Sequence, residues 1–200
     1  MKRQRLATID HDRSGDSAAS RLERLPGWLI VMQLILAYLW LVSGTNKLLD
    51  PHFGTQLVPL LRQSTQGNPY GWYATFLRVI VLPNHTLFAL AVQVMEPAIG
   101  LALLLGAGLW IFRPHGRITI YGALAASAAL LGSAGLSLNY FFQGGIYLPW
   151  INSGNALNPG VDINIMTALV SVVVLGANLS ALLAARSKPM APRRVKGEAA

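Results

Sequence analysis

Residues 86–112 read TLFALAVQVMEPAIGLALLLGAGLWIF, an apolar stretch of 27 residues in which Glu96 is the one charged side chain. A helix needs about 20 apolar residues to cross the hydrocarbon core of a bilayer, so this stretch is long enough. A charged residue inside such a helix is costly, and it usually has a partner or a function. The stretch therefore predicts a membrane-spanning helix with a candidate functional residue near its middle.

Three further apolar stretches carry no charged side chain. They are GWLIVMQLILAYLWLVSGT at 27–45, ITIYGALAASAALLGSAGLSLNYFF at 118–142 and IMTALVSVVVLGANLSALLAA at 165–185. The first exceeds the roughly 7–15 apolar residues of a signal peptide, so we interpret it as a retained span. Together the four stretches take up close to half of the 200 residues. We therefore predict an all-α integral membrane protein built as a four-helix bundle.

The composition argues against a soluble domain, a cysteine-based site and a nucleic-acid-binding protein. Apolar residues make up 53% of the chain and charged residues 12%, whereas soluble domains carry about 25% charged residues. The chain has no cysteine, which excludes disulfides, thiolate metal sites and iron–sulfur clusters. The net charge of +8 lies at the two ends and in one short loop, which is a membrane pattern rather than a nucleic-acid-binding one.

The distribution of Lys and Arg predicts the topology. Thirteen of the 16 Lys and Arg residues lie in the two tails and in the short loop 113–117. The remaining three, Lys47, Arg62 and Arg78, lie in the long loop 46–85, and the other long loop, 143–164, has none. Positive residues accumulate on the cytoplasmic side, so we predict a multi-pass protein of the cell membrane with both termini in the cytoplasm and both long loops outside.

The chain divides into three predicted regions. These are a disordered cytoplasmic tail at 1–25, a four-span membrane domain at 26–186 and a basic cytoplasmic tail at 187–200. Inside the first long loop, the turn signal QGNP at 66–69 precedes the aromatic-rich segment 70–82. We predict that this segment is one short helix lying in the outer membrane interface.

Glu96 is the main candidate for chemistry. It lies about ten residues into its helix, roughly 15 Å from one end and thus near the membrane midplane. Pro97 follows it, and a proline inside a helix kinks it and frees the backbone carbonyl four residues earlier, here that of Gln93. One interpretation is a protonated glutamate that bonds this carbonyl and holds the kink. The other is a residue that handles protons or binds a ligand.

Further polar side chains gather between the midplane and the outer surface, and each of the four helices contributes at least one. The candidate site residues among them are Asn46, Lys47, Gln93, Asn139 and Tyr140. This concentration of polar side chains in the outer half of the bundle predicts a pocket open to the outer face. Lys47 could equally extend to the lipid headgroups, and Asp162 could simply cap the fourth helix.

No cofactor site follows from the residues alone. Haem bound between helices needs a pair of intramembrane histidines, and the four histidines fall in tails, loops or at span ends. No metal cluster, phosphate loop or dinucleotide fingerprint is visible, so we expect no haem, no metal and no nucleic acid as a partner.

Four segments resemble the DoxX/DoxD family. They are LWLVSGTNKLLDPHF at 39–53, WYATFLRVIVLPNHTLFA at 72–89, EPAIGLALLLG at 96–106 and LNYFFQGG at 138–145. The resemblance covers about residues 28–182, which is nearly everything except the tails. None of the segments is a sharp catalytic signature, and the likeness rests on their order within a four-span frame.

The resemblance implies a four-helix integral membrane protein. The DoxD branch of the family is the small membrane subunit of thiosulfate:quinone oxidoreductase, which joins two thiosulfates into tetrathionate and passes the electrons to quinone. The resemblance therefore implies quinone as electron acceptor and a second subunit from another chain, so that an oligomer or a complex is expected in the lipid bilayer. On the same resemblance, Lys47, Glu96, Asn139 and Asn46 stand at positions of the family's motif residues.

Two hypotheses of different classes follow. In the first, the chain is an oxidoreductase subunit: Glu96 is catalytic and relays protons, Tyr140 and Asn139 bond quinone carbonyls, and Lys47 or Arg78 attracts an anionic sulfur substrate. In the second, the chain is a non-enzymatic membrane scaffold or assembly factor that docks soluble redox proteins. Short helices, small-residue faces and basic tails suit the second hypothesis as well.

Overall fold

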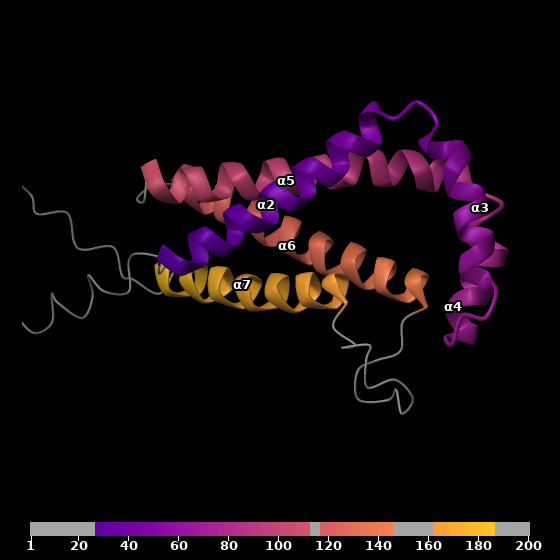
Figure 1. The fold of residues 1–200 in the computed structure, drawn as a ribbon. Helices are drawn as coiled ribbons and strands as arrows, with labels where there is room; N and C mark the ends of the chain where they lie inside the picture. Colours follow the sequence, from indigo (N-terminus) through magenta and orange to yellow (C-terminus); the bar gives the residue numbers. More distant parts are fainter. Residues whose placement is uncertain (1–26, 113–116, 146–161, 187–200) are drawn as a thin grey trace, which may run out of the picture.

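The computed structural model describes residues 27–112, 117–145 and 162–186, and over these residues the chain is all-helical (Figure 1). The two predicted tails and most of the second long loop lie outside the described residues. The division of the chain into tails and membrane domain therefore stays a prediction.

Four long helices form a bundle, as predicted. They are α2 (Gly27–Leu49), α5 (His85–Phe112), α6 (Arg117–Gly144) and α7 (Ile163–Arg186). Each is long and apolar enough to cross a membrane, so the chain is a multi-pass helical membrane protein by length and composition. Helix α2 packs mainly on α5, α5 also on α6, and α6 on α7. The predicted fold class is confirmed.

A short helical segment lies at one end of this bundle. It consists of α3 (Phe53–Thr65), α4 (Gly71–Phe76) and the π-helical turn η1 (Leu77–Val81). Figure 1 shows α3 and α4 running across the ends of α5 and α6. We call α3, α4 and η1 the cover segment, and this end of the molecule the cover end. Helix α4 and η1 confirm the helix predicted at 70–82, whereas α3 was not predicted.

Helix α3 is amphipathic, which explains both its position and why it was not predicted. Leu57 and Leu61 are buried and lie four residues apart, on one face of the helix. Most of the other side chains of α3 are polar or exposed. A search for long uniformly apolar stretches passes over such a segment, while the spacing of its leucines would have revealed it.

Asn68 fastens the cover segment to the bundle. Its Nδ2 donates to the carbonyl oxygens of Ser64 at 3.0 Å and Phe142 at 2.9 Å, and its Oδ1 accepts from the backbone N–H of Tyr70. The neighbouring Gly67 has a φ of +71°, a conformation that glycine adopts without strain. The predicted turn between α3 and α4 is thus bonded directly to the end of α6.

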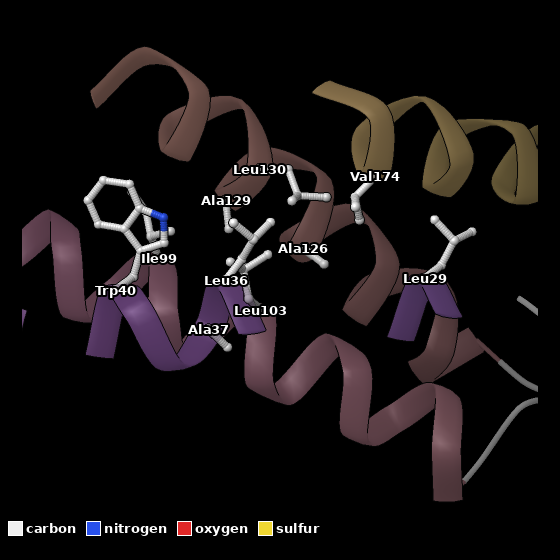
Figure 2. Close-up of a cluster of buried hydrophobic side chains, with 10 residues drawn as sticks. All are labelled: Leu29, Leu36, Ala37, Trp40, Ile99, Leu103, Ala126, Ala129, Leu130 and Val174. Carbon is white, nitrogen blue, oxygen red and sulfur yellow. The ribbon is translucent and has the colours of Figure 1, made fainter. Parts of the chain in front are cut away.

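The centre of the bundle is an apolar cluster with side chains from all four long helices (Figure 2). Leu36, Leu103, Leu130 and Val174, one from each helix, are at most 2% exposed. Buried alanines of α6 complete the cluster, and a Cβ on Gly106 of α5 would lie 2.7 Å from the Cβ of Ala126. The small residues of α6 therefore serve close helix packing, which is one of their common uses in membrane bundles.

Two glycines let α2 and α5 approach each other closely. A Cβ on Gly44 would collide with the Pro97 ring and lie 2.9 Å from the Cβ of Glu96. A Cβ on Gly100 would lie 2.8 Å from the backbone nitrogen of Leu41. Helix α5 continues through Pro97. The contact at Gly44 brings the last turn of α2 beside Glu96.

The predicted topology can be tested with single cysteines, because the native chain has none. We expect His52→Cys, exposed at the cover end, to react with a membrane-impermeant thiol reagent added to intact cells. We expect Phe112→Cys, 81% exposed at the opposite end of α5, to react only after the cells are opened. The reverse pattern of labelling would place the cover end in the cytoplasm.

Candidate functional site

Glu96 is paired with two side chains from other helices. Lys47 of α2 forms a salt bridge to its Oε1, and the hydroxyl of Tyr140, on α6, donates a hydrogen bond to the same oxygen. Glu96 is 0% exposed and the Lys47 side chain 24%. A buried carboxylate is tolerated when it is both ion-paired and hydrogen-bonded, and this arrangement supplies both.

Further contacts hold Lys47 in place. Its Nζ donates to the Ser43 hydroxyl at 3.0 Å and to the Tyr140 hydroxyl at 3.4 Å, and it lies 4.9 Å from the centre of the Tyr140 ring. Gln93 donates to the backbone carbonyl of Lys47 at 2.8 Å. The lysine therefore points into the bundle toward Glu96, and the alternative in which it extends to the lipid headgroups is not what the structure shows.

The second carboxyl oxygen of Glu96 is buried and has no hydrogen-bond partner among the described residues. The interpretation in which Glu96 bonds the freed carbonyl of Gln93 is therefore not the arrangement observed. A buried oxygen without a partner is uncommon and costs about 1–3 kcal/mol. The position of Glu96 is better explained by its bonds to Lys47 and Tyr140 than by the proline beside it.

Asn139 lies one residue from Tyr140 and is held by the cover segment. The hydroxyl of Tyr73, on α4, contacts the Asn139 backbone carbonyl at 3.0 Å and its Oδ1 at 2.8 Å. The side-chain Nδ2 of Asn139 donates no hydrogen bond within the described part of the chain. Tyr73 was predicted only as part of an aromatic interfacial helix, and the signal that it belongs to this site is its burial beneath α3 rather than any motif.

Between the cover segment and the bundle lies a pocket of about 280 Å³. Its polar end is formed by Lys47, Asn139, Tyr140 and Tyr73, and most of its remaining wall is apolar. The apolar wall comes from the cover segment and α5, and includes Leu57, Leu61, Leu77, Val81, Phe88 and Val92. Glu96 lies behind Lys47 and Tyr140 and does not itself line the pocket.

Two of the candidate residues stand apart from this cluster. Asn46 is exposed on α2, and Arg78 is exposed on η1. Neither lines the pocket. By contrast, the structure brings together the other candidates, which are Lys47, Glu96, Tyr140, Gln93 and Asn139. Their roles in any reaction stay predictions.

Asp162 caps α7. Its Oδ1 accepts hydrogen bonds from the backbone N–H groups of Asn164 at 2.7 Å and Ile165 at 3.3 Å. These are the bonds by which an N-cap aspartate satisfies the free donors of a helix start. Of the two interpretations left open for this residue, the structure supports the cap.

Burial raises the pKa of Tyr73 from 10.0 to about 12. The cause is loss of solvation, since the side chain is 3% exposed. As the pH rises, the unfolded chain releases this proton near pH 10 and the folded chain only near pH 12. The stabilisation is therefore complete below pH 10 and is lost between pH 10 and 12.

We expect Tyr73→Phe to flatten this alkaline loss of stability. At neutral pH the variant should be less stable by about 1 kcal/mol, because its bond to Asn139 is gone. Its melting temperature in detergent should then approach that of the native chain as the pH nears 12, since the phenylalanine has no proton to lose. Tyr38→Phe, at a residue 67% exposed, is the matched control and should run parallel to the native curve. If the melting temperature of Tyr73→Phe falls with pH in parallel with that of the native chain, the raised pKa of Tyr73 is contradicted.

Comparison with known proteins gives no family assignment. No family model matches the chain, and neither a curated protein nor a solved structure shows significant similarity to it. The function must therefore be argued from the site.

Proposed function

We propose that the chain is the membrane subunit of an oxidoreductase that passes electrons to quinone, and that the pocket beneath the cover segment binds the quinone headgroup. The observation that carries this proposal is the buried Glu96 carboxyl, bonded to two side chains that line the pocket. A quinone that accepts two electrons also takes up two protons. A site for it therefore needs an apolar slot and a group that can supply protons.

The pocket residues fit such a ligand. Ligand pockets have apolar walls with a few converging polar groups. Here the apolar walls face a polar end that offers the ammonium of Lys47, the hydroxyl of Tyr140 and the side-chain amide of Asn139. The volume of about 280 Å³ suits a single-ring headgroup whose tail stays outside. Lys47 and Tyr140 already donate to Glu96, whereas the Asn139 Nδ2 has no acceptor among the described residues, so this amide is the donor free to orient a ring carbonyl.

The resemblance to the DoxX/DoxD family supports a sulfur compound as the electron source. Two thiosulfates that join through a new S–S bond to give tetrathionate release two electrons, and these reduce one quinone. On this proposal a second subunit takes the electrons from thiosulfate, while this chain holds the quinone and Glu96 passes protons through Tyr140 or Lys47. The chain would then work in the cell membrane as part of a complex.

The proposal is tested by assaying the purified chain with and without the products of its neighbouring genes. We expect the complex to reduce a short-tailed quinone when thiosulfate is added, with one tetrathionate formed for each quinone reduced. We expect the chain alone to bind the quinone without reducing it. Quinone-independent recruitment of soluble redox proteins would instead favour the scaffold hypothesis.

Filling the pocket should abolish quinone binding. Val92 lines the pocket, and Val94 on the same helix is 54% exposed on the opposite side of the wall. We expect Val92→Trp to weaken binding at least tenfold, because the indole occupies the slot, and Val94→Trp to bind as the native chain does. Binding can be measured by fluorescence quenching or calorimetry in detergent. Equal affinity in both variants would place the quinone elsewhere.

A further inference from the structure

We propose that Glu96 exchanges protons only with the cover end of the bundle, because a dry layer of apolar side chains closes the interior on its other side. The inference rests on the proposed function only for the reaction that consumes the proton. The sidedness itself follows from the arrangement of the polar and apolar residues along the bundle.

Toward the cover end, Glu96 is connected to the pocket. Its Oε1 is bonded to the Lys47 ammonium and the Tyr140 hydroxyl, and both of these side chains line the pocket. They are the titratable groups that contact Glu96 among the described residues, one from α2 and one from α6. Lys47 is also partly open to solvent, with 24% of its side chain exposed. A proton can therefore pass between the pocket and Glu96 over a single side chain.

Away from the cover end, the next polar groups run across the bundle rather than along it. The indole N–H of Trp40 donates to the Ser133 hydroxyl at 2.7 Å, and Ser133 and Ser171 share a hydrogen bond of 2.8 Å. The Ser171 hydroxyl donates to the backbone carbonyl of Thr167 at 2.7 Å. This chain of bonds joins α2, α6 and α7 and ends on a carbonyl. It provides no step toward the far end of the molecule.

One helical turn further lies the dry layer, formed by Leu36, Leu103, Leu130 and Val174 (Figure 2). These side chains come from all four long helices and are 2%, 0%, 0% and 1% exposed. Protein interiors pack as densely as organic crystals, so such a layer leaves no room for water. A turn of helix spans about 5.4 Å, which is too far for a proton to move without an intervening polar group.

Beyond the dry layer the polar groups form a separate set. Gln33 donates to the backbone carbonyl of Leu103 at 2.9 Å, and Asn178 donates to Gln33 at 3.4 Å. Within the described residues, neither side chain bonds to Trp40, Ser133 or Glu96. Across the described helices, the interior therefore holds two polar regions with an apolar layer between them, and Glu96 belongs to the one at the cover end.

In the proposed reaction, both protons taken up with two electrons would come from the side on which the cover segment lies. No proton would cross the bundle, so turnover would not acidify one side of the membrane at the expense of the other by this route.

Single-cysteine variants test the sidedness without requiring turnover, since a thiol reacts with a membrane-impermeant reagent only where water reaches it. Ser43→Cys reports on water beside Lys47, Asn139→Cys reports on the pocket, and Leu130→Cys reports on the dry layer. The exposed His52→Cys and Phe112→Cys identify the two sides in reconstituted vesicles.

We expect Ser43→Cys and Asn139→Cys to react only with reagent on the side that labels His52→Cys. We expect Leu130→Cys to react roughly 100-fold more slowly than Ser43→Cys from either side. Labelling of Ser43→Cys from the Phe112 side, or of Leu130→Cys at a comparable rate, would overturn the proposal. In vesicles that reduce quinone, a pH-sensitive dye measures separately from which side the protons are taken up. If quinone reduction fails there, the labelling result is unaffected.

Discussion

A chain with Glu96→Gln should fold and yet reduce quinone roughly 10²–10⁴-fold more slowly than the native complex, the range by which proton transfer groups accelerate reactions. The amide oxygen can still accept the bonds from Lys47 and Tyr140, so the geometry around the pocket is kept. The amide cannot take up or release a proton in the range where a carboxyl does. Turnover should therefore fall while the melting temperature in detergent stays close to the native value.

Glu96→Asp provides the matched variant, because it ionises but is one methylene shorter. Partial activity would show that the reach to Lys47 and Tyr140 matters as well as the proton. Quinone affinity should be measured beside turnover, since a relay affects kcat more than KM. If Glu96→Gln keeps both stability and full turnover, Glu96 is a structural residue and the argument for proton transfer at this site is lost.

Removing the other partner of the salt bridge should have the larger effect on stability. We expect Lys47→Met to destabilise the fold by about 3–5 kcal/mol, because it leaves a buried carboxyl without its cation. The two ends of the pair differ in exposure: Glu96 is 0% exposed and Lys47 24%. An unpaired Lys47 can still reach water, whereas an unpaired Glu96 cannot. Unfolding in a denaturing detergent should therefore show a clearly lower stability for Lys47→Met than for Glu96→Gln.

The double variant Lys47→Met, Glu96→Gln is the control for this asymmetry. Methionine fills much of the space of the lysine stem, and glutamine carries no charge that needs a cation, so most of the lost stability should return. Recovery would show that the loss in Lys47→Met comes from the unpaired carboxyl. A double variant that is as unstable as Lys47→Met alone would assign the loss to packing of the lysine stem instead.

The spans were predictable because a uniformly apolar run of about 20 residues is rare outside membrane-spanning helices. Each of the four observed long helices contains the whole stretch predicted for it. The end of α2 was harder to place, since the apolar run stops before Lys47 while the helix continues to Leu49. Lys47, for which the sequence left open both a site role and a position at the lipid headgroups, is thus part of the helix and turned toward α5.

The pairing within the site was not predictable from the sequence. The positions of Lys47, Glu96 and Tyr140 along their helices place them in one half of the bundle, but their contacts depend on the register between helices. The close approach at Gly44 sets that register between α2 and α5, and no pattern of single residues in the sequence predicts this contact. Neighbouring residues on a helix point about 100° apart, which explains why Asn46 is exposed whereas Lys47 is largely turned into the bundle.

The separation of Lys47 and Glu96 by 49 residues has a consequence for the synthesis of the protein. Helix α2 leaves the ribosome and enters the membrane before α5 has been translated, so its lysine has no counter-charge during insertion. The lysine can remain at the water-facing end of α2 in that interval. Helix α5 arrives later with a carboxyl in its middle, and the lysine already in place can receive it. The order of the two charges along the chain thus allows the more deeply buried one to find its partner on insertion.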